Sequence, residues 1–304
     1  VTLQASATDT GSGIAKVDFF SETTLIGTSA GPTAFTATWD TAAFGGARTL
    51  TAVATDVAGN QTTSAMVSVT VANGAPAVTS LSAVTSDGSY GVGATIDISV
   101  TFTEPVVVTG TPTLQLETGD LDRLATYLSG SGTATLLFRY VVQSGDSSAD
   151  LDCASADALA LAGGSIASTG GTAAALSLPM PGAPMSLGAQ KAIVVDGSIP
   201  VVTAVDSITP DGAYASGASI DVRVTFSEAV TVSGAPTLLL ETGATDRQAT
   251  YVSGSGSTVL IFTYVPLLGD ASADLDYAST AALLDGTIAD AAGNAALREL
   301  PAPG

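Results

Sequence analysis

An internal repeat limits what this chain can fold into more than any other feature of its sequence. Residues 77–153 align without gaps onto residues 201–277 at an offset of 124, with 44 identities in the 77 positions. For example, Leu116-Glu117-Thr118-Gly119 recurs as Leu240-Glu241-Thr242-Gly243. A repeat of this length is long enough to bury a core of its own. The sequence therefore predicts two copies of one domain, preceded by a different N-terminal unit.

Two short linkers divide the 304 residues into three units. They are Asn73-Gly74-Ala75-Pro76 and Asp196-Gly197-Ser198-Ile199-Pro200, in which turn-forming residues precede a proline. We expect unit one at 1–73, unit two at 74–198 and unit three at 199–304, arranged end to end because the linkers are short. Unit two continues into a predicted closing strand over 191–195, for which unit three has no counterpart. This difference leads us to expect a piece of a longer protein.

Apolar and polar residues alternate along the segments that we expect to be strands. In unit two, apolar residues occupy every second position from 96 to 102, and unit three repeats this pattern from 220 to 226. A period of two predicts half-buried strands, and the frequent glycine-containing turns between them are typical of a β-sandwich. A segment rich in Ala and Leu, 156–162, suggests one short helical turn. The chain as a whole is predicted to be all-β.

Composition excludes several classes of function. The chain has no histidine, which rules out Ser-His-Asp triads and His-ligated metals, and one cysteine, Cys153, which rules out an internal disulfide. A net charge of −20 argues against nucleic acid and anionic lipid as partners but is compatible with divalent cations. No apolar run approaches the length of about 18 residues that a membrane span needs, so we expect no membrane insertion of this segment.

Several sequence motifs in the three units are informative about the kind of domain that each unit forms. Unit one carries SGIAKVDFF at 12–20, Trp39-Asp40-Thr41 and Asp56-Val57-Ala58-Gly59-Asn60, and resembles a short bacterial Ig-like domain. Units two and three resemble the longer Ig-like or cadherin-like repeats of large bacterial surface adhesins, on the segments 224–228, 269–277 and 290–294. The resemblance implies three tandem Ig-like β-sandwich domains in an extended arrangement. Unit two departs from the motifs of the family at two places. Cys153 stands where unit three has Tyr277, and residues 168–172 replace the turn that unit three has at 290–294.

A run of acidic residues in each long unit suggests a cation site. Asp150 and Asp152 are two residues apart, so on a strand their carboxylates share one face and Leu151 takes the other; Asp146 lies just before them. Unit three repeats all three acids as Asp270, Asp274 and Asp276. Close carboxylates repel one another unless a cation or hydrogen-bond donors neutralise them, and an all-oxygen set suits Ca²⁺. The alternative is that the acids decorate a solvated face and a turn.

Strand direction predicts a second cation site where two units meet. If the strand ending at Phe102 runs antiparallel to the first strand of its domain, Glu104 faces Asn73, and by the same argument Glu228 faces Asp196. The sequence then predicts that four acids of units two and three converge at their junction. These are Asp87, Asp146, Asp196 and Glu228. Asp211, the counterpart of Asp87, is a further candidate ligand in unit three. The alternative is that these residues are solvated loop acids.

We expect a structural protein rather than an enzyme. Paired carboxylates can hydrolyse glycosides, but here they lie on small repeated domains with Trp39 as the single tryptophan. The resemblance implies a spacer or stalk of a secreted or cell-surface bacterial adhesin, stiffened by calcium, whose partners are neighbouring repeats of the same protein. One alternative is a module that binds a glycan or a surface protein through exposed tyrosines, and another is an accessory region of a large secreted enzyme. The tyrosines concerned are Tyr90, Tyr127, Tyr214 and Tyr251.

Overall fold

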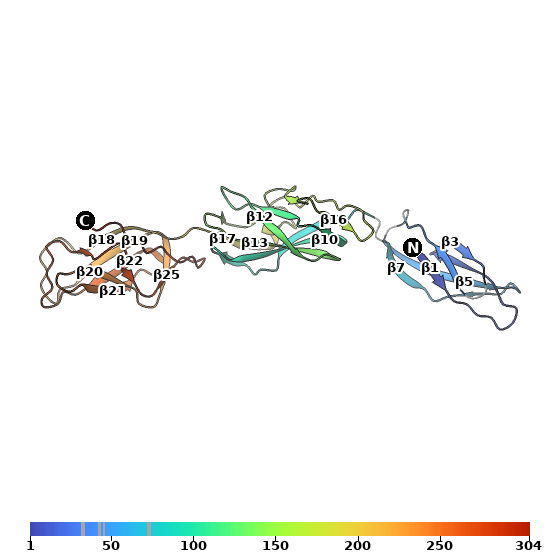
Figure 1. The fold of residues 1–304 in the computed structure, drawn as a ribbon, viewed down its shortest axis with the longest axis horizontal. Helices are drawn as coiled ribbons and strands as arrows, with labels where there is room; N and C mark the ends of the chain where they lie inside the picture. Colours follow the sequence, from blue (N-terminus) through green and yellow to red (C-terminus); the bar gives the residue numbers. More distant parts are fainter. Residues whose placement is uncertain (32–33, 42–43, 45, 72–73) are drawn as a thin grey trace.

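The computed structural model describes residues 1–31, 34–41, 44, 46–71 and 74–304. It is nearly all-β, with strands grouped into three units that follow one another in a row (Figure 1). The fold is therefore three tandem Ig-like β-sandwiches in an extended arrangement, as the sequence predicts. Within the described ranges, no helix is long and apolar enough to cross a membrane.

Unit one is a small sandwich of two sheets. Its strands are β1 (Thr2–Ala5), β2 (Ile14–Ser21), β3 (Thr24–Ser29), β4 (Phe35–Thr38), β5 (Gly46–Asp56), β6 (Gln61–Thr63) and β7 (Val67–Val71). β1 pairs with β4, and the other five strands form the second sheet around β2 and β5. Val17, Phe19 and Phe35 are buried between the sheets, because alternate residues of β2 and β4 face inward.

Unit two consists of a seven-stranded sheet and a smaller three-stranded one. The strands are β8 (Val78–Ala83), β9 (Gly88–Tyr90), β10 (Thr95–Thr109), β11 (Thr113–Leu116), β12 (Arg123–Ser129), β13 (Thr133–Val141), β14 (Ser147–Ser148), β15 (Leu159–Ala160), β16 (Ser165–Ser168) and β17 (Ile193–Asp196). A short helix, α1 (Leu187–Gln190), precedes β17. β17 lies between β14 and β9, and it runs parallel to β9.

Unit three repeats the larger sheet of unit two. Its strands are β18 (Val202–Ser207), β19 (Ile220–Ser233), β20 (Thr237–Glu241), β21 (Arg247–Ser253), β22 (Ser257–Tyr264), β23 (Asp276–Tyr277), β24 (Leu283–Leu284) and β25 (Thr287–Ala289). The pair Ile96–Tyr140 of β10 and β13 recurs as Ile220–Tyr264 of β19 and β22, at the same offset of 124. The described strands of unit three include no counterpart of β9, β14 or β17.

Alternation of apolar residues builds the core of both long units. Ile96, Ile98 and Val100 are fully buried in unit two, whereas the residues between them face solvent or the neighbouring layer. Phe138 is buried opposite Ile98 and is contacted edge-on by Tyr127. The expected half-buried strands are thus confirmed. The predicted helical turn at 156–162 is wrong: this segment holds β15, because Leu159 pairs with β11 and fills the core.

The longest strand of each long unit changes partner halfway. β10 pairs with β8 up to Phe102 and with β16 from Val106, and it pairs with β13 on both sides of a register shift between Thr101 and Val106. β19 does the same, with β18 and β22 first and β25 from Thr231. The register shift between the two parts is a bulge that redirects the backbone, and it contains Glu104 in β10 and Glu228 in β19. Both glutamates therefore lie at the end of their unit that faces the preceding one.

Candidate metal centre

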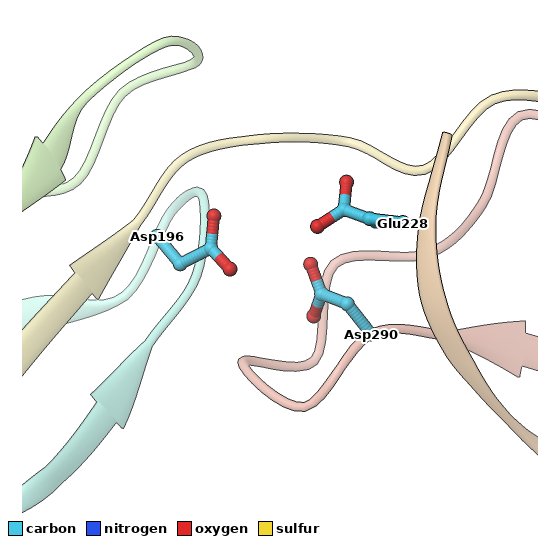
Figure 2. Close-up of side chains that lie close together, drawn as sticks. All are labelled: Asp196, Glu228 and Asp290. Atoms are coloured by element: carbon cyan, nitrogen blue, oxygen red, sulfur yellow. The ribbon is translucent and has the colours of Figure 1, made fainter. Parts of the chain in front are cut away.

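Three acidic side chains from units two and three meet at the junction between these units. One carboxylate oxygen from each of Asp196, Glu228 and Asp290 lies within 4.8 Å of those of the other two. Figure 2 shows the three carboxylates facing a common space, with Asp196 on one side and Glu228 and Asp290 on the other. Asp196 is the last residue of β17, Glu228 lies in the bulge of β19, and Asp290 directly follows β25. We call this group the junction cluster.

The turn from Asp290 to Asn294 holds the cluster in place. The backbone N–H of Asn294 donates to Asp290 Oδ1 at 2.9 Å, and its side-chain Nδ2 donates to Asp290 Oδ2 at 2.7 Å. Nδ2 also donates to the carbonyl oxygen of Asp196 at 2.8 Å, and the N–H of Val92 donates to Asn294 Oδ1 at 2.6 Å. Because Asn294 bonds to both units, the turn that carries Asp290 is docked onto unit two.

Like charges act on one another within the junction cluster. Burial raises the pKa of the Glu228 carboxyl above its ordinary value, and the nearby Asp196 and Asp290 raise it further. None of the ion pairs found among the described residues involves these three acids. The cluster thus concentrates negative charge that no basic side chain offsets, and a bound cation would relieve the repulsion.

The residues of the cluster fit a calcium ion. Calcium binds oxygen ligands at about 2.4 Å, so two ligands on opposite sides of one ion are about 4.8 Å apart. The three carboxylates meet this limit and offer hard oxygen ligands, which favour Ca²⁺ over softer metals. Calcium needs six to eight oxygens, which second carboxylate oxygens and water would complete. An ion held here would link unit two to unit three.

Two of the four acids predicted at this junction lie there. Asp196 and Glu228 meet, as strand direction predicts, whereas the placement of Asp87 is wrong. β9 runs parallel to β17, so Asp87 lies beside the start of β17 while Asp196 is at its end. Asp87 Oδ1 accepts a hydrogen bond from the Ala192 N–H at 3.3 Å and lies 3.9 Å from Lys191 Nζ.

Asp146 is near the junction, but its carboxylate points into unit two. Its carbonyl oxygen accepts the N–H of Gly197 in the linker at 2.6 Å. The side chain is 1% exposed and accepts hydrogen bonds from Arg123 Nε at 2.7 Å, Tyr140 Oη at 2.6 Å and the Gln143 N–H at 2.8 Å. Three donors satisfy this buried carboxylate. It therefore stabilises unit two, and the prediction that it joins the junction cluster is wrong.

The three acids of the run in unit two are not among the described groups of acids close enough to share one ion. Asp150 and Asp152 both lie beside Gly188, and Leu151 between them is fully buried, as alternation predicts. Asp152 accepts the backbone N–H groups of Cys153, Gly182 and Leu187, at 2.8, 2.9 and 3.2 Å. Its carboxylate thus anchors the segment that leads to α1, while the carboxylate of Asp146 is bonded elsewhere.

The corresponding acids of unit three are also separate. Asp270 repeats the bonds of Asp146, and the N–H of Leu267, followed by the Tyr264 hydroxyl, lowers the pKa of its carboxyl. Asp276 accepts the N–H groups of Tyr277 and Gly304, whereas Asp274 and Asp211 are exposed. Within the part of the chain that the structure describes, the junction cluster is the one group of three acids close enough to share an ion.

Among the described residues, the junction between units one and two shows no such group of three acids. Glu104 occupies the place of Glu228, but Ser168 replaces Asp290. The turn keeps two of the bonds of the Asp290–Asn294 turn, since the Thr172 N–H donates to Ser168 Oγ at 3.1 Å and the Ser168 N–H donates to the Thr172 carbonyl at 2.8 Å, but Thr172 replaces Asn294. Asn73, which we expected Glu104 to face, lies outside the described residues.

Sequence reasoning missed Asp290 as a member of the cluster. The Asp-x-Ala-Gly-Asn sequence is typical of a tight turn, and its hydrogen bonds do form one. Unit one has the same turn from Asp56 to Asn60, with matching bonds of 2.8 and 2.7 Å, but there it is exposed. The strand pairing could have identified Asp290. Because β25 pairs with the second half of β19, it ends near Glu228.

The tyrosines considered for ligand binding are engaged in contacts within their own units. Tyr127 and Tyr251 pack edge-on against Phe138 and Phe262, and their hydroxyls accept backbone N–H groups. The hydroxyl of Tyr90 donates to a carbonyl oxygen four residues earlier in its loop.

Cys153 is 2% exposed, and burial raises the pKa of its thiol to about 12.

Comparison with known proteins supports an Ig-like fold at the N-terminus. Residues 1–52 match a family model described as a bacterial Ig domain. Among solved structures, the chain is similar to the fibronectin(III)-like modules of Clostridium thermocellum CbhA, at 13% identity and a TM-score of 0.23, over 65% of this chain and 85% of that one. No curated protein matches the chain. The Ig-like fold thus rests on residues 1–52 and on the strand arrangement of all three units.

Proposed function

We propose that this segment is a structural spacer of a secreted or cell-surface bacterial adhesin, and that calcium stiffens the joint between units two and three. The observation that carries the proposal is the junction cluster, in which one acid of unit two meets two acids of unit three within 4.8 Å. Support for a spacer comes from the row of three sandwiches and from the bacterial Ig match. The proposal assigns the segment no catalytic step.

Calcium would act by linking two rigid bodies. Hydrogen bonds of Asn294 already hold the units in contact, but the three carboxylates beside them repel one another. An ion that binds only when Asp196 lies near Glu228 and Asp290 favours the aligned arrangement by its own binding free energy. The partners in this function are the neighbouring repeats of the same protein.

Thermal unfolding in excess EDTA and then in millimolar Ca²⁺ tests the proposal, with Mg²⁺ as the control ion. We expect calcium to raise the melting temperature of units two and three, because ligand that binds the folded state alone stabilises it. Magnesium should have a smaller effect, since it demands tighter octahedral geometry and keeps its waters.

The variant Glu228→Gln tests whether the calcium response depends on the junction cluster or on the other acids. We expect this variant to lose the calcium-induced rise in melting temperature. In EDTA at pH 7 it should be at least as stable as the wild type, because a raised carboxyl pKa means that the ionised form is disfavoured in the folded state. Glu104→Gln, the matched change at the other junction, should keep the full calcium response. Equal calcium responses of the two variants would contradict the proposal.

A further inference from the structure

Unit three has an open groove along one side of its core. The groove has a volume of about 610 Å³. Apolar side chains of β18, β19 and β22 line it, among them Val205, Val222 and Tyr264. Aspartates are its most frequent charged residues, and five of them line it. These are Asp206, Asp211, Asp270, Asp274 and Asp276.

In unit two, the corresponding place is filled by the segment 183–196, which contains α1 and β17. Leu187 and Ile193 are fully buried there, and Val195 is 2% exposed. Residue 193 pairs with Gly88 in the parallel ladder of β9, and Ser147 of β14 pairs with Asp196 on the other side. The segment therefore closes the sandwich as a central strand between two short ones.

Backbone groups that bind this segment in unit two have counterparts along the groove. In unit two, the N–H groups of Leu81, Gly88 and Leu151 donate to the carbonyl oxygens of Met185, Ala192 and Ile193, at 2.8, 3.1 and 2.8 Å. The residues equivalent to these three donors are Val205, Gly212 and Leu275. All three line the groove of unit three.

Side chains that line the open groove of unit three are more exposed than their counterparts in unit two. Ile96 and Ile98 are 0% exposed, whereas their counterparts Ile220 and Val222 are 8% and 7% exposed. Leu151 is fully buried and its counterpart Leu275 only partly so. The strands β9 and β14 also have no equivalent in unit three, because a two- or three-residue strand forms only against a partner.

Charge and geometry indicate which kind of segment fits. In unit two, Lys191 Nζ lies 3.9 Å from Asp87 Oδ1. The counterpart of Asp87 in unit three is Asp211, which is exposed and lines the groove. In unit two, Gly182 directly precedes the segment 183–196, and its N–H donates to Asp152 Oδ2 at 2.9 Å. Gly304 makes the same bond to Asp276, the counterpart of Asp152, at 2.7 Å.

We propose that the groove of unit three binds an extended peptide segment of the same chemistry as residues 183–196. The occupant lies parallel to 212–214 and accepts the N–H groups of Gly212 and Leu275 through its carbonyl oxygens. Its apolar residues at alternate positions cover Ile220 and Val222, and a lysine two residues before the first of these apolar residues pairs with Asp211. Addition of a strand to an open sheet gives affinity through the main chain and selectivity through alternate side chains.

A synthetic peptide with the sequence of residues 183–196 tests the proposal on the whole chain by isothermal titration calorimetry. We expect a stoichiometry of one, because the equivalent site in unit two is already filled. Hydrogen exchange should slow at Gly212 and Leu275 and stay unchanged at Gly88 and Leu151. The same peptide with Ile193→Asp and Val195→Asp should bind at least about tenfold more weakly, since two buried side chains become charged.

A tethered version makes the test independent of weak affinity. The sequence of residues 183–196 is joined to the chain after Gly304, which raises its effective concentration to the millimolar range. We expect the tethered segment to slow hydrogen exchange at the backbone amides of Gly212 and Leu275. The doubly substituted segment should leave their exchange rates unchanged. Asp211→Lys should weaken binding of the free peptide by roughly two- to fivefold, and a Lys191→Glu peptide should restore it. The same exchange at these two amides with and without the tethered segment would overturn the proposal.

Discussion

Units two and three share one repeated sequence, and the structure shows which of their features depend on it. Both bury the same alternating residues of β10 and β19, at matching register with β13 and β22. They differ where the sequences diverge: unit two is closed by α1 and β17, and unit three is open along that side. The larger sheet is thus the same in both units, whereas the burial of one side of its core differs with the closing segment.

The buried aspartate of each unit shows the same difference on a smaller scale. Asp146 and Asp270 each accept hydrogen bonds from an arginine, a tyrosine and a backbone N–H. The arginine bond measures 2.7 Å in unit two and 3.0 Å in unit three, and the side-chain exposures are 1% and 6%. The closed unit thus holds its aspartate more tightly than the open one.

Asp146→Ala should have the largest effect on stability. Its removal leaves the Tyr140 hydroxyl and the Gln143 N–H without their acceptor and Arg123 without its partner. Loss of one member of a buried charged pair costs roughly 3–5 kcal/mol, so we expect unit two to lose a large part of its free energy of unfolding. Chemical denaturation of this variant and of Asp270→Ala checks the comparison. The effect at Asp270 should be clearly smaller, and equal losses would contradict the difference between closed and open units.

Alkaline unfolding should distinguish the two tyrosines that bond these aspartates. Burial, followed by the Asp270 hydrogen bond, raises the pKa of Tyr264 to about 12, and the pKa of Tyr140 is raised further for the same reasons with Asp146. A raised pKa in the folded state stabilises the fold below pH 10, and this stability is lost as pH rises through the folded pKa. In an absorbance titration, Tyr264 should ionise near pH 12 in the folded unit and Tyr140 only as unit two unfolds. Tyr140→Phe and Tyr264→Phe identify the two transitions.

The smallest effect concerns two exposed cross-strand ion pairs. Asp97 bonds Arg139 between β10 and β13, whereas unit three instead pairs Asp206 with Arg223 between β18 and β19. Each arginine lowers the pKa of its aspartate, so this stability is present above pH 4 and is lost as pH falls through the lowered pKa. Solvent screens both pairs, so Asp97→Asn and Asp206→Asn should each change the acid unfolding midpoint only slightly. A large shift for either would mean that the pair is not solvated.

Much of the fold could be predicted from local patterns in the sequence. Alternation at 96–102 and the offset of 124 predicted the shared sheet, and strand direction placed Asp196 and Glu228 together. The errors arose where a long-range pairing decides position. Asp87 lies away from the junction because β9 pairs in parallel with β17, more than 100 residues later in the chain. Asp290 was missed because its role depends on a turn docking onto another unit.

Distance distributions between spin labels test the central claim most directly. Leu128→Cys and Val252→Cys place labels at equivalent, exposed positions of β12 and β21, and the buried Cys153 should stay unlabelled. If calcium stiffens the junction through Asp196, Glu228 and Asp290, the distribution across units two and three should narrow on adding Ca²⁺. A Leu25→Cys and Leu128→Cys pair, which spans the other junction, should give the same distribution with and without the ion. Equal widths in EDTA and in calcium across units two and three would contradict the account.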